Sequence, residues 1–300
     1  MKKRLYRYSL ITVVLLLIGE IVLRIYPGVG ERPLYEVDSF CEYKLQPNQN
    51  ISRFRNSYQT NSYGMRSGKV SDKNKKNVLL FGDSVINGGT RVDQKDLSSE
   101  ILKEKLSEFF QNQVGVHNIS AGSWGPENAY RYFEQYVDFD FDMIVMAFSS
   151  HDYNDNMHFR SVVGQEPAWP NEQPLSAITD VFSNFLYPKI KSMMGDKYDY
   201  LDGFDDSAVN PGWDLFINYC TVNNVPLLVY VHPEASEISN GAFDQSGKDL
   251  INKLKNQKVS FVNGMDTEQK GNYIDNIHMN SNGHKLLAET LYNEIIKVSF

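Results

Sequence analysis

From residue 77 onward the sequence alternates short apolar runs with amphipathic stretches, and this alternation constrains the fold more than any other feature. Val78 to Phe81 is a continuous apolar run that ends at Gly82, which is typical of a strand buried on both faces. Leu97 to Phe110 then has apolar residues at helical spacing. Strands that alternate with helices predict a parallel sheet with helices on both faces. Functional groups in such sheets gather beyond the carboxyl ends of the strands.

The same alternation continues to the end of the chain. Further strands are expected at 114–119, 143–148, 226–231 and 260–262, and further helices at 126–137, 213–222 and 283–296. An irregular insertion at about 152–210 interrupts the pattern and is expected to hold one helix near 176–193. Residues 27–76 are polar and predict an extended arm or linker of short strands and loops. We therefore expect a single α/β domain over residues 77–300.

The N-terminus predicts a membrane segment. Four basic residues within the first seven positions precede an apolar run from Leu10 to Leu23. With its aromatic flanks the segment reaches about 20 residues, enough to span a bilayer as a helix. The positive-inside rule places the N-terminus in the cytoplasm and the rest of the chain outside.

The alternative to an anchor is a cleaved signal peptide. Its apolar region would have a similar length, but no small-x-small cleavage site precedes Pro27. We therefore expect residues 1–26 to be an uncleaved single-pass anchor in the cell membrane, with an extracytoplasmic domain. Glu20 would be costly at mid-bilayer and is tolerable near an interface.

Composition argues against several classes of protein. The chain has a net charge of -7, which disfavours nucleic acid as the main partner because phosphate binding needs clustered cations. The two cysteines, Cys41 and Cys220, cannot make a disulfide scaffold, although one bridge between them stays possible. The six histidines are scattered and no Cys-x-x-Cys occurs, so we expect no metal and no organic cofactor.

Gly82-Asp83-Ser84 directly follows the first expected strand. A serine hydroxyl is a weak nucleophile that needs a base within hydrogen-bond reach and an exposed position. The preceding glycine lets the backbone turn sharply at the strand end. Such a tripeptide is common in ordinary turns, but its place after a strand favours a nucleophile.

Asp275-Asn-Ile-His278 lies just before the last expected helix. One helical turn would bring the side chains of Asp275 and His278 to the same side. The carboxylate could then hold one ring nitrogen while the other faces the serine, as in a catalytic triad. The alternative is a capping loop with a surface histidine.

Together these motifs resemble the SGNH (GDSL) hydrolase family. The block from Asp275 to Leu286 is similar to the end of that family's sequences, and the resemblance covers residues 77–300 apart from the insertion. It implies a flavodoxin-like, three-layer α/β/α fold. It also implies Ser84 as nucleophile, His278 as general base and acid, and Asp275 as the orienting carboxylate.

Two family blocks that supply the oxyanion hole differ here. The second block, Asn-x-x-x-x-Gly, aligns from Asn118 and puts Ser123 at the glycine position, with Gly122 one residue earlier. The donor there is a backbone N–H, which a serine can also supply. Gly122 and Ser123 therefore both remain candidates, beside the N–H of Ser84.

The third block, Gly-x-Asn-Asp, aligns on Asp152 and puts His151 where the family has asparagine. A neutral imidazole can donate one hydrogen bond and so replace the amide. Asn154 is the alternative donor. An oxyanion donor lowers the reaction barrier by about 3–4 kcal/mol, so the choice between His151 and Asn154 matters.

Other histidines and aromatic residues receive simpler interpretations. We expect His284 on the exposed start of the last helix, His117 within a strand, and His232 beyond the fourth strand without a partner motif. Three aromatic residues are candidates either for a sugar-binding cleft or for the core: Trp124, Tyr153 and Trp169.

The combined hypothesis is an outward-facing serine esterase of SGNH type. Family analogy and location suggest that it removes O-acyl groups, such as acetyl, from a cell-envelope or exported polysaccharide, or acts on another small ester. One alternative is a carbohydrate O-acyltransferase that uses the same three residues. Another is a non-catalytic glycan-binding or assembly protein, which the altered second and third blocks favour.

Overall fold

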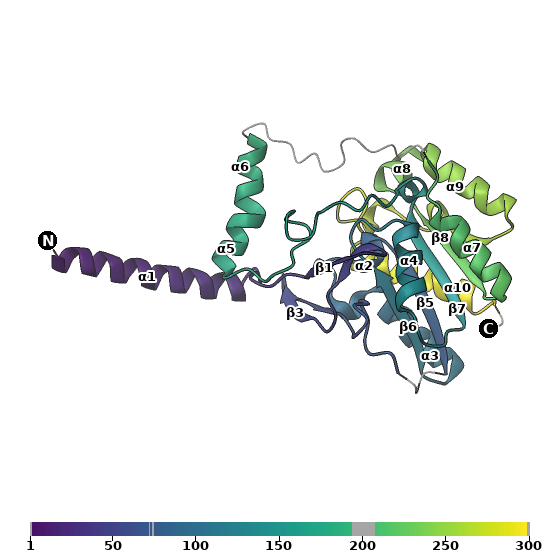
Figure 1. Cartoon of the computed structure of the whole chain (residues 1–300), viewed down its shortest axis with the longest axis horizontal. Helices are drawn as coiled ribbons and strands as arrows, with labels where there is room; N and C mark the ends of the chain where they lie inside the picture. The colour runs from purple at the N-terminus through teal and green to yellow at the C-terminus, as the bar shows by residue number, and fades with distance from the viewer. Residues whose placement is uncertain (1, 72, 74, 194–207, 299–300) are drawn as a thin grey trace.

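Five parallel strands form the centre of the molecule (Figure 1). The computed structural model describes residues 2–71, 73, 75–193 and 208–298. The strands are β5 (Lys76–Gly82), β6 (Val114–Ser120), β7 (Met143–Ser149), β8 (Leu227–His232) and β9 (Ser260–Asn263). They lie in the order β6-β5-β7-β8-β9, each pair parallel. Counted along the chain this is the flavodoxin-like order 2-1-3-4-5, as expected for the fold class.

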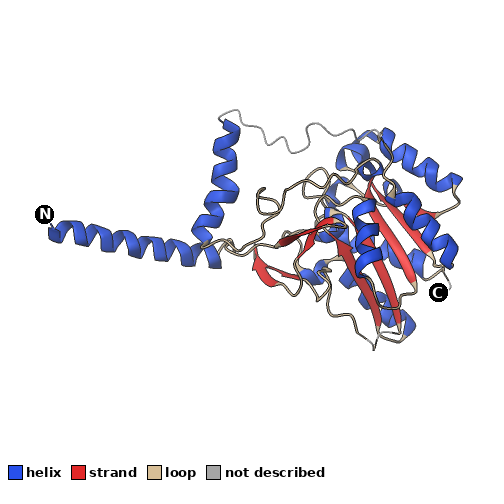
Figure 2. Cartoon of the chain, in the orientation of Figure 1, coloured by secondary structure: helices blue, strands red, loops and turns tan. Residues whose placement is uncertain are grey.

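Helices cover both faces of this sheet (Figure 2). One face is covered by α3 (Ser98–Phe110) and α10 (Ser281–Ile295), and the other by α4 (Pro126–Tyr136), α7 (Gly212–Asn223) and α9 (Gln245–Asn256). Successive side chains of a strand point to opposite faces. In β5, Leu79 and Phe81 therefore enter the core under α4 and α7, while Val78 and Leu80 enter the core under α3 and α10. All four side chains are fully buried, which explains the continuous apolar run.

Most expected elements occur within a few residues of their predicted bounds. The interval after β8 differs, because it contains α8 (Ala235–Asn240) and α9, neither of which was expected. The apolar stripe of α9 consists only of Leu250, Ile251 and Leu254, so its composition is mostly polar. Asp244 begins the helix by accepting the backbone N–H of Gly247 at 2.9 Å.

The insertion contains the helix expected near 176–193. It is made of α5 (Ala177–Val181), a π-helical turn (Phe182–Leu186) and α6 (Tyr187–Met193). Residues 194–207 of the insertion lie outside the described part of the chain. Short 3₁₀ helices occupy Gln94–Asp96, Ser150–Tyr153, Gly264–Asp266 and Lys270–Asn272.

The arm forms two antiparallel hairpins. These are β1 (Tyr35–Asp38) with β2 (Glu42–Leu45), and β3 (Asn50–Arg53) with β4 (Asn56–Gln59). Tyr43 of β2 donates its hydroxyl hydrogen to the carbonyl of Gly122 at 2.9 Å and accepts the indole N–H of Trp124 at its own carbonyl, also at 2.9 Å. The first hairpin therefore holds the loop that follows β6.

The N-terminal helix α1 (Lys2–Ile25) extends away from the domain (Figure 1). None of its side chains is buried, and it is long and apolar enough to cross a membrane. A signal sequence would have the same length and composition. Cys41 and Cys220 are both free and buried.

Candidate active site

Ser84 lies at the carboxyl end of β5, where it begins the short helix α2 (Ser84–Asn87). The turn between strand and helix depends on Gly82. A Cβ at this position would lie 2.6 Å from the carbonyl oxygen of Ala147 and 2.3 Å from a side-chain carbon of Ile86. No larger residue fits there, so the sharp turn that presents Ser84 requires glycine.

Asp83, which is buried, stabilises the same turn through two hydrogen bonds. One of its carboxylate oxygens caps α2 by accepting the N–H of Val85 at 2.8 Å. The other accepts the hydroxyl hydrogen of Ser149, at the end of β7, at 2.8 Å. The middle residue of Gly-Asp-Ser is therefore a buried structural link between two strand ends.

His278 faces Ser84 from the loop before α10. Its Nε2 lies 3.0 Å from the Ser84 Oγ, and its Nδ1 lies 2.9 Å from Oδ2 of Asp275. The loop is not the helical turn expected from the spacing. Asp275 instead accepts the backbone N–H groups of Ile277 and His278 at 2.9 and 2.8 Å, which folds the loop back on itself.

The carboxyl group of Asp275 is held in its ionised form. Partial burial opposes ionisation, but the backbone N–H groups of His278 and Ile277 and the imidazole ring outweigh it and lower the pKa of Asp275. An ionised carboxylate on Nδ1 directs the free electron pair of Nε2 toward the serine hydroxyl. This is the geometry that a nucleophile, its base and an orienting carboxylate require.

A buried network supports the histidine loop from behind. His232, at the end of β8, bonds Glu268 through Nδ1 at 2.7 Å and the carbonyl oxygen of Ile277 through Nε2 at 2.8 Å. Burial lowers the pKa of His232, but the Glu268 carboxylate and the Ile277 carbonyl more than compensate and raise it. Glu268 also accepts the hydroxyls of Tyr230 and Tyr273. His232 thus has the partner that the sequence did not reveal, and it fixes the residue before His278.

Ser84 and His278 line a cavity of about 340 Å³. Gly122, Ser123 and His151 from the ends of β6 and β7 line it as well. Other walls come from outside the sheet, among them Tyr35 of the arm and Asp155 and Trp169 of the insertion. The strand ends therefore supply the reactive groups, and the arm and insertion shape the space in front of them.

At the end of β6 the backbone distinguishes the two candidate donors. Ser123 has φ +55°, a left-handed conformation that favours glycine. The N–H of Gly122 is directed at the Tyr35 hydroxyl and acts to lower the pKa of that phenol. The N–H groups of Ser84 and Ser123 have no acceptor within the described residues. The local geometry therefore favours Ser123 over Gly122 as a donor toward the cavity.

The surroundings of His151, at the end of β7, favour its charged form. Burial acts to lower its pKa, but Asp152, Glu234 and Asp83 together raise the pKa of His151 to about 10. Its Nδ1 lies 3.2 Å from Glu234, and its Nε2 lies 3.6 Å from an oxygen of Asp152. The sequence suggested a neutral imidazole; the neighbouring carboxylates favour an imidazolium, in which both nitrogens are donors.

Asn154, the alternative donor, points elsewhere. Its side-chain amide donates to the carbonyl of Ala208 at 3.1 Å, and its side-chain oxygen accepts the hydroxyl of Ser246 at 3.2 Å. It does not line the cavity at Ser84. Of the two residues, only His151 is placed near the nucleophile.

Among the described residues, one group of side chains comes close enough to share a metal ion. The ligand atoms of Asp83, His151 and Asp152 lie within 4.8 Å of one another. Histidine binds a metal as the neutral ring, so an ion at this group would have to displace the proton that the neighbouring carboxylates favour on His151. Asp83 and Asp152 already accept hydrogen bonds from the Ser149 hydroxyl and the Ser149 N–H. Within the group, the structure shows one charged contact, His151 Nε2 to Asp152 Oδ1 at 3.6 Å.

Two sequence interpretations need correction or refinement. His284 is fully buried, so the prediction of an exposed position is wrong. It lies in the first turn of α10, accepts the N–H of Ser98 at 3.2 Å, and burial lowers its pKa to about 3. Among the aromatic candidates, Trp169 lines the cavity and Trp124 belongs to the core.

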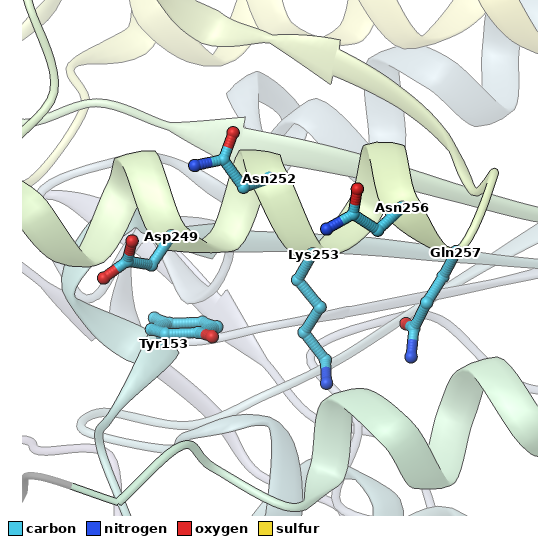
Figure 3. Close-up of a pocket in the computed structure, with 6 residues that line it drawn as sticks. All are labelled: Tyr153, Asp249, Asn252, Lys253, Asn256 and Gln257. Atoms are coloured by element: carbon cyan, nitrogen blue, oxygen red, sulfur yellow. The ribbon is translucent and has the colours of Figure 1, made fainter.

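Tyr153 lines a different cavity, of about 420 Å³, beside α9 (Figure 3). Its other lining residues all lie on or just after that helix: Asp249, Asn252, Lys253, Asn256 and Gln257. It shares no lining residue with the cavity at Ser84 and contains no serine or histidine. Its lysine, Lys253, is paired with Asp214 at 2.6 Å.

No family model and no curated protein matches the sequence. Solved structures with a similar fold include a lipase/acylhydrolase from Enterococcus faecalis, at 13% identity over 73% of this chain and 95% of that one, with a TM-score of 0.42. A member of the lipolytic protein G-D-S-L family from Veillonella parvula matches at 11% identity over 74% of this chain and 100% of that one, with a TM-score of 0.43. The carbohydrate acetylesterase Est24 from Sinorhizobium meliloti matches at 15% identity over 74% of this chain and 99% of that one, with a TM-score of 0.41. These proteins are too distant to bear on activity, and the fold class rests on the strand order.

Proposed function

We propose that this protein is a serine ester hydrolase of the SGNH type. The observation that carries the proposal is the hydrogen-bonded chain from Ser84 through His278 to Asp275 at the wall of a cavity. Such a chain, at the carboxyl ends of a flavodoxin-like sheet, meets the requirements for covalent acyl transfer. The order of the motifs along the chain, with the serine first and Asp-x-x-His before the last helix, agrees with it.

In the first half of the reaction, Nε2 of His278 takes the proton of Ser84 as Oγ attacks the ester carbonyl. The negative charge that develops on the carbonyl oxygen is stabilised by the N–H groups of Ser84 and Ser123 and by the imidazolium of His151. The tetrahedral intermediate collapses to an acyl-serine. The leaving alkoxide departs with the proton held by His278.

In the second half, water attacks the acyl-serine and gives its proton to His278. Collapse of the second intermediate releases the carboxylic acid, and the proton returns to Ser84. A charged donor at His151 stabilises the oxyanion more strongly than the amide of the family would, because hydrogen bonds from ionised donors are about twice as strong as neutral ones.

The substrate we propose is a small O-acyl ester, such as an acetyl ester, of a carbohydrate in the cell envelope or an exported polysaccharide. The cavity of about 340 Å³ suits a small acyl group, and Trp169 and Tyr35 at its walls offer aromatic surface to a sugar ring. Residues 1–26 would hold the domain at the outer face of the membrane, where such polymers occur.

A fluorophosphonate probe tests the catalytic proposal most directly. Wild-type protein should be labelled once, at Ser84, and should hydrolyse an aryl acetate, whereas Ser84→Ala should do neither. Absence of labelling in the wild type, or equal labelling of Ser84→Ala, would reject catalysis at this serine and favour a non-catalytic glycan-binding role. Acetate release from an acetylated oligosaccharide, measured with and without an unacetylated sugar acceptor, separates hydrolysis from acyl transfer.

The anchor is tested separately. The full chain should stay with membranes after alkaline carbonate extraction, and protease added from outside intact spheroplasts should degrade the domain. Release of the chain by carbonate would indicate a cleaved or peripheral N-terminus instead.

A further inference from the structure

The helical segment Ala177–Met193 of the insertion exposes a run of large apolar side chains. Phe182, Leu186 and Ile190 follow one another at intervals of four, and Met193 comes three residues later. Their exposed fractions lie between 46% and 80%. Apolar residues at this spacing form one stripe along a helix. A soluble domain rarely leaves such a stripe uncovered unless it contacts a partner or a membrane.

This segment is fixed to the arm by a buried carboxylate. Asp180 of α5 is fully buried and accepts hydrogen bonds from Arg53 at 2.5 Å and from the backbone N–H of Gly30 at 3.0 Å. The ring of Phe185 also contacts that of Phe54 edge-on, with centroids 6.4 Å apart. These contacts fix the position of the apolar stripe relative to the arm.

The same segment contacts the N-terminal helix near its outer end. The carboxylate of Glu20 in α1 accepts the backbone N–H groups of Ala177 and Ile178 at 2.9 and 3.1 Å, and bonds Arg24 at 2.7 Å. Glu20 is the one acidic residue of α1, and these three donors satisfy it where it would otherwise face lipid. α5 therefore begins at the depth of Glu20, close to where α1 would leave the bilayer.

From that point α5 and α6 run across the direction of α1 instead of along it (Figure 1). If α1 spans the bilayer, a helix that crosses it at this level lies along the membrane surface. An amphipathic helix in that position buries its apolar face about 5–10 Å deep, at the boundary between headgroups and acyl chains.

We propose that residues 177–193 form an interfacial helix whose apolar stripe inserts into the outer leaflet beside α1. The occupant of the stripe is lipid, because the stripe continues the bare apolar surface of α1, which has no buried side chain. The exposed Lys189 beside the stripe suits the headgroup region. The proposal rests on membrane insertion of α1, as proposed above.

Insertion at two places would fix the orientation of the domain. A single spanning helix allows rotation about its axis, whereas a second helix in the membrane plane, held through Asp180 and Glu20, removes that freedom. The insertion would then have two roles, since its first part lines the cavity through Asp155 and Trp169.

Lipid contact can be measured with single cysteines in the full chain. The native Cys41 and Cys220 are buried, so an introduced surface cysteine can be labelled selectively with the dye NBD. Phe182→Cys, Leu186→Cys and Ile190→Cys sample the stripe, Leu16→Cys samples α1, and Asn252→Cys on exposed α9 is the control. Each labelled protein is reconstituted into phosphatidylcholine–phosphatidylglycerol vesicles, with and without brominated acyl chains.

The proposal predicts severalfold quenching by brominated lipid at all three stripe positions, to a similar extent, and none at Asn252→Cys. Quenching that declines steadily from 182 to 190 would overturn it, because the helix would then leave the membrane. Quenching at Leu16→Cys alone would overturn the interfacial helix and still support α1 as a membrane anchor. Absence of quenching at every position would reject both the interfacial helix and the anchor. Labels shielded from aqueous iodide but untouched by brominated lipid would identify a protein partner or a second copy instead.

Discussion

The ends of β5 and β7 lie side by side in the sheet, yet they are built in different ways. At the end of β5, Ser84 sits in a turn made by its own neighbours in sequence, Gly82 and Asp83. At the end of β7, the pKa of His151 is raised first by its neighbour Asp152 and then by Glu234 and Asp83, which are distant in sequence. The nucleophile is thus defined by its own turn, whereas the charge of the neighbouring donor also depends on groups that the fold brings to it.

This difference separates two ways in which a strand end can be built into a site. A local turn keeps its motif because each residue in it has a steric or hydrogen-bonding task. A donor whose charge is set by carboxylates outside its own turn depends on where the fold places them. His151 is such a donor, since it lines the cavity with its Nδ1 3.2 Å from Glu234.

The largest expected effect concerns the β5 end. Ser84→Ala and His278→Ala should each lower kcat for an aryl ester by at least about 10⁴-fold, and the double variant should be no worse than either single one, because the two residues act as a unit. Unchanged thermal unfolding would show that the fold is intact. A double variant far slower than both singles would mean that the serine and histidine act independently.

The β7 end should show a smaller loss. His151→Ala should lower kcat about 10²- to 10³-fold with little change in KM, as loss of one oxyanion donor does. His151→Asn should recover part of the rate, because an amide can donate in the same place.

Asn154→Ala serves as the matched control for His151, because it also follows β7 but bonds Ala208 outside the cavity. Its kcat should stay close to the wild-type value. A larger loss in Asn154→Ala than in His151→Ala would reverse the assignment of the donor and remove the contrast between the two strand ends.

The sequence predicted the sheet well because its strands are buried on both faces and contain little but apolar residues. It also brought Ser84, Asp275 and His278 into consideration, since each lies in a short motif next to a strand or helix end. That these three side chains meet is a property of the fold, and their catalytic role stays a prediction.

What the sequence could not supply is the long-range partners. Glu234 lies 83 residues from His151, and Glu268 lies 36 residues from His232. Neither carboxylate belongs to a motif. The charge of His151 and the hydrogen bonds that support the histidine loop could therefore not be predicted from the sequence. The burial of His284 was missed for a related reason, because the face of α10 that meets α3 depends on packing between distant helices.

Loss of the Glu268–His232 contact behind the histidine loop should have an intermediate effect on kcat. Glu268→Gln removes the charge that pairs with His232 and should let the loop before His278 shift. A misplacement of up to about 1 Å corresponds to a loss of roughly ten- to a hundredfold in kcat, with KM nearly unchanged. Tyr273→Phe removes one hydrogen bond to Glu268 but keeps the ion pair, so its loss should be smaller.

A purely structural role for Glu268 would give a different result. The melting temperature would fall, but the kcat of the remaining folded protein would match the wild type. Steady-state kinetics well below the melting temperature, with active sites counted by the fluorophosphonate probe, distinguishes the two.

The smallest effect is a shift in pH dependence at the β7 end. The pKa of His151 is raised to about 10, above its unfolded value of roughly 6.5, so its ion pairs stabilise the fold fully below pH 6.5 and are lost as pH rises through about 10. In Glu234→Gln one of the charges that raise this pKa is gone, and the basic limb of the kcat profile should move to lower pH while the rate at pH 7 changes little. Profiles recorded from pH 6 to 10.5 for both proteins test this. Superimposable basic limbs would mean that Asp152 and Asp83 alone set the charge of His151, and the contrast with the locally built β5 end would then rest on nearer neighbours than Glu234.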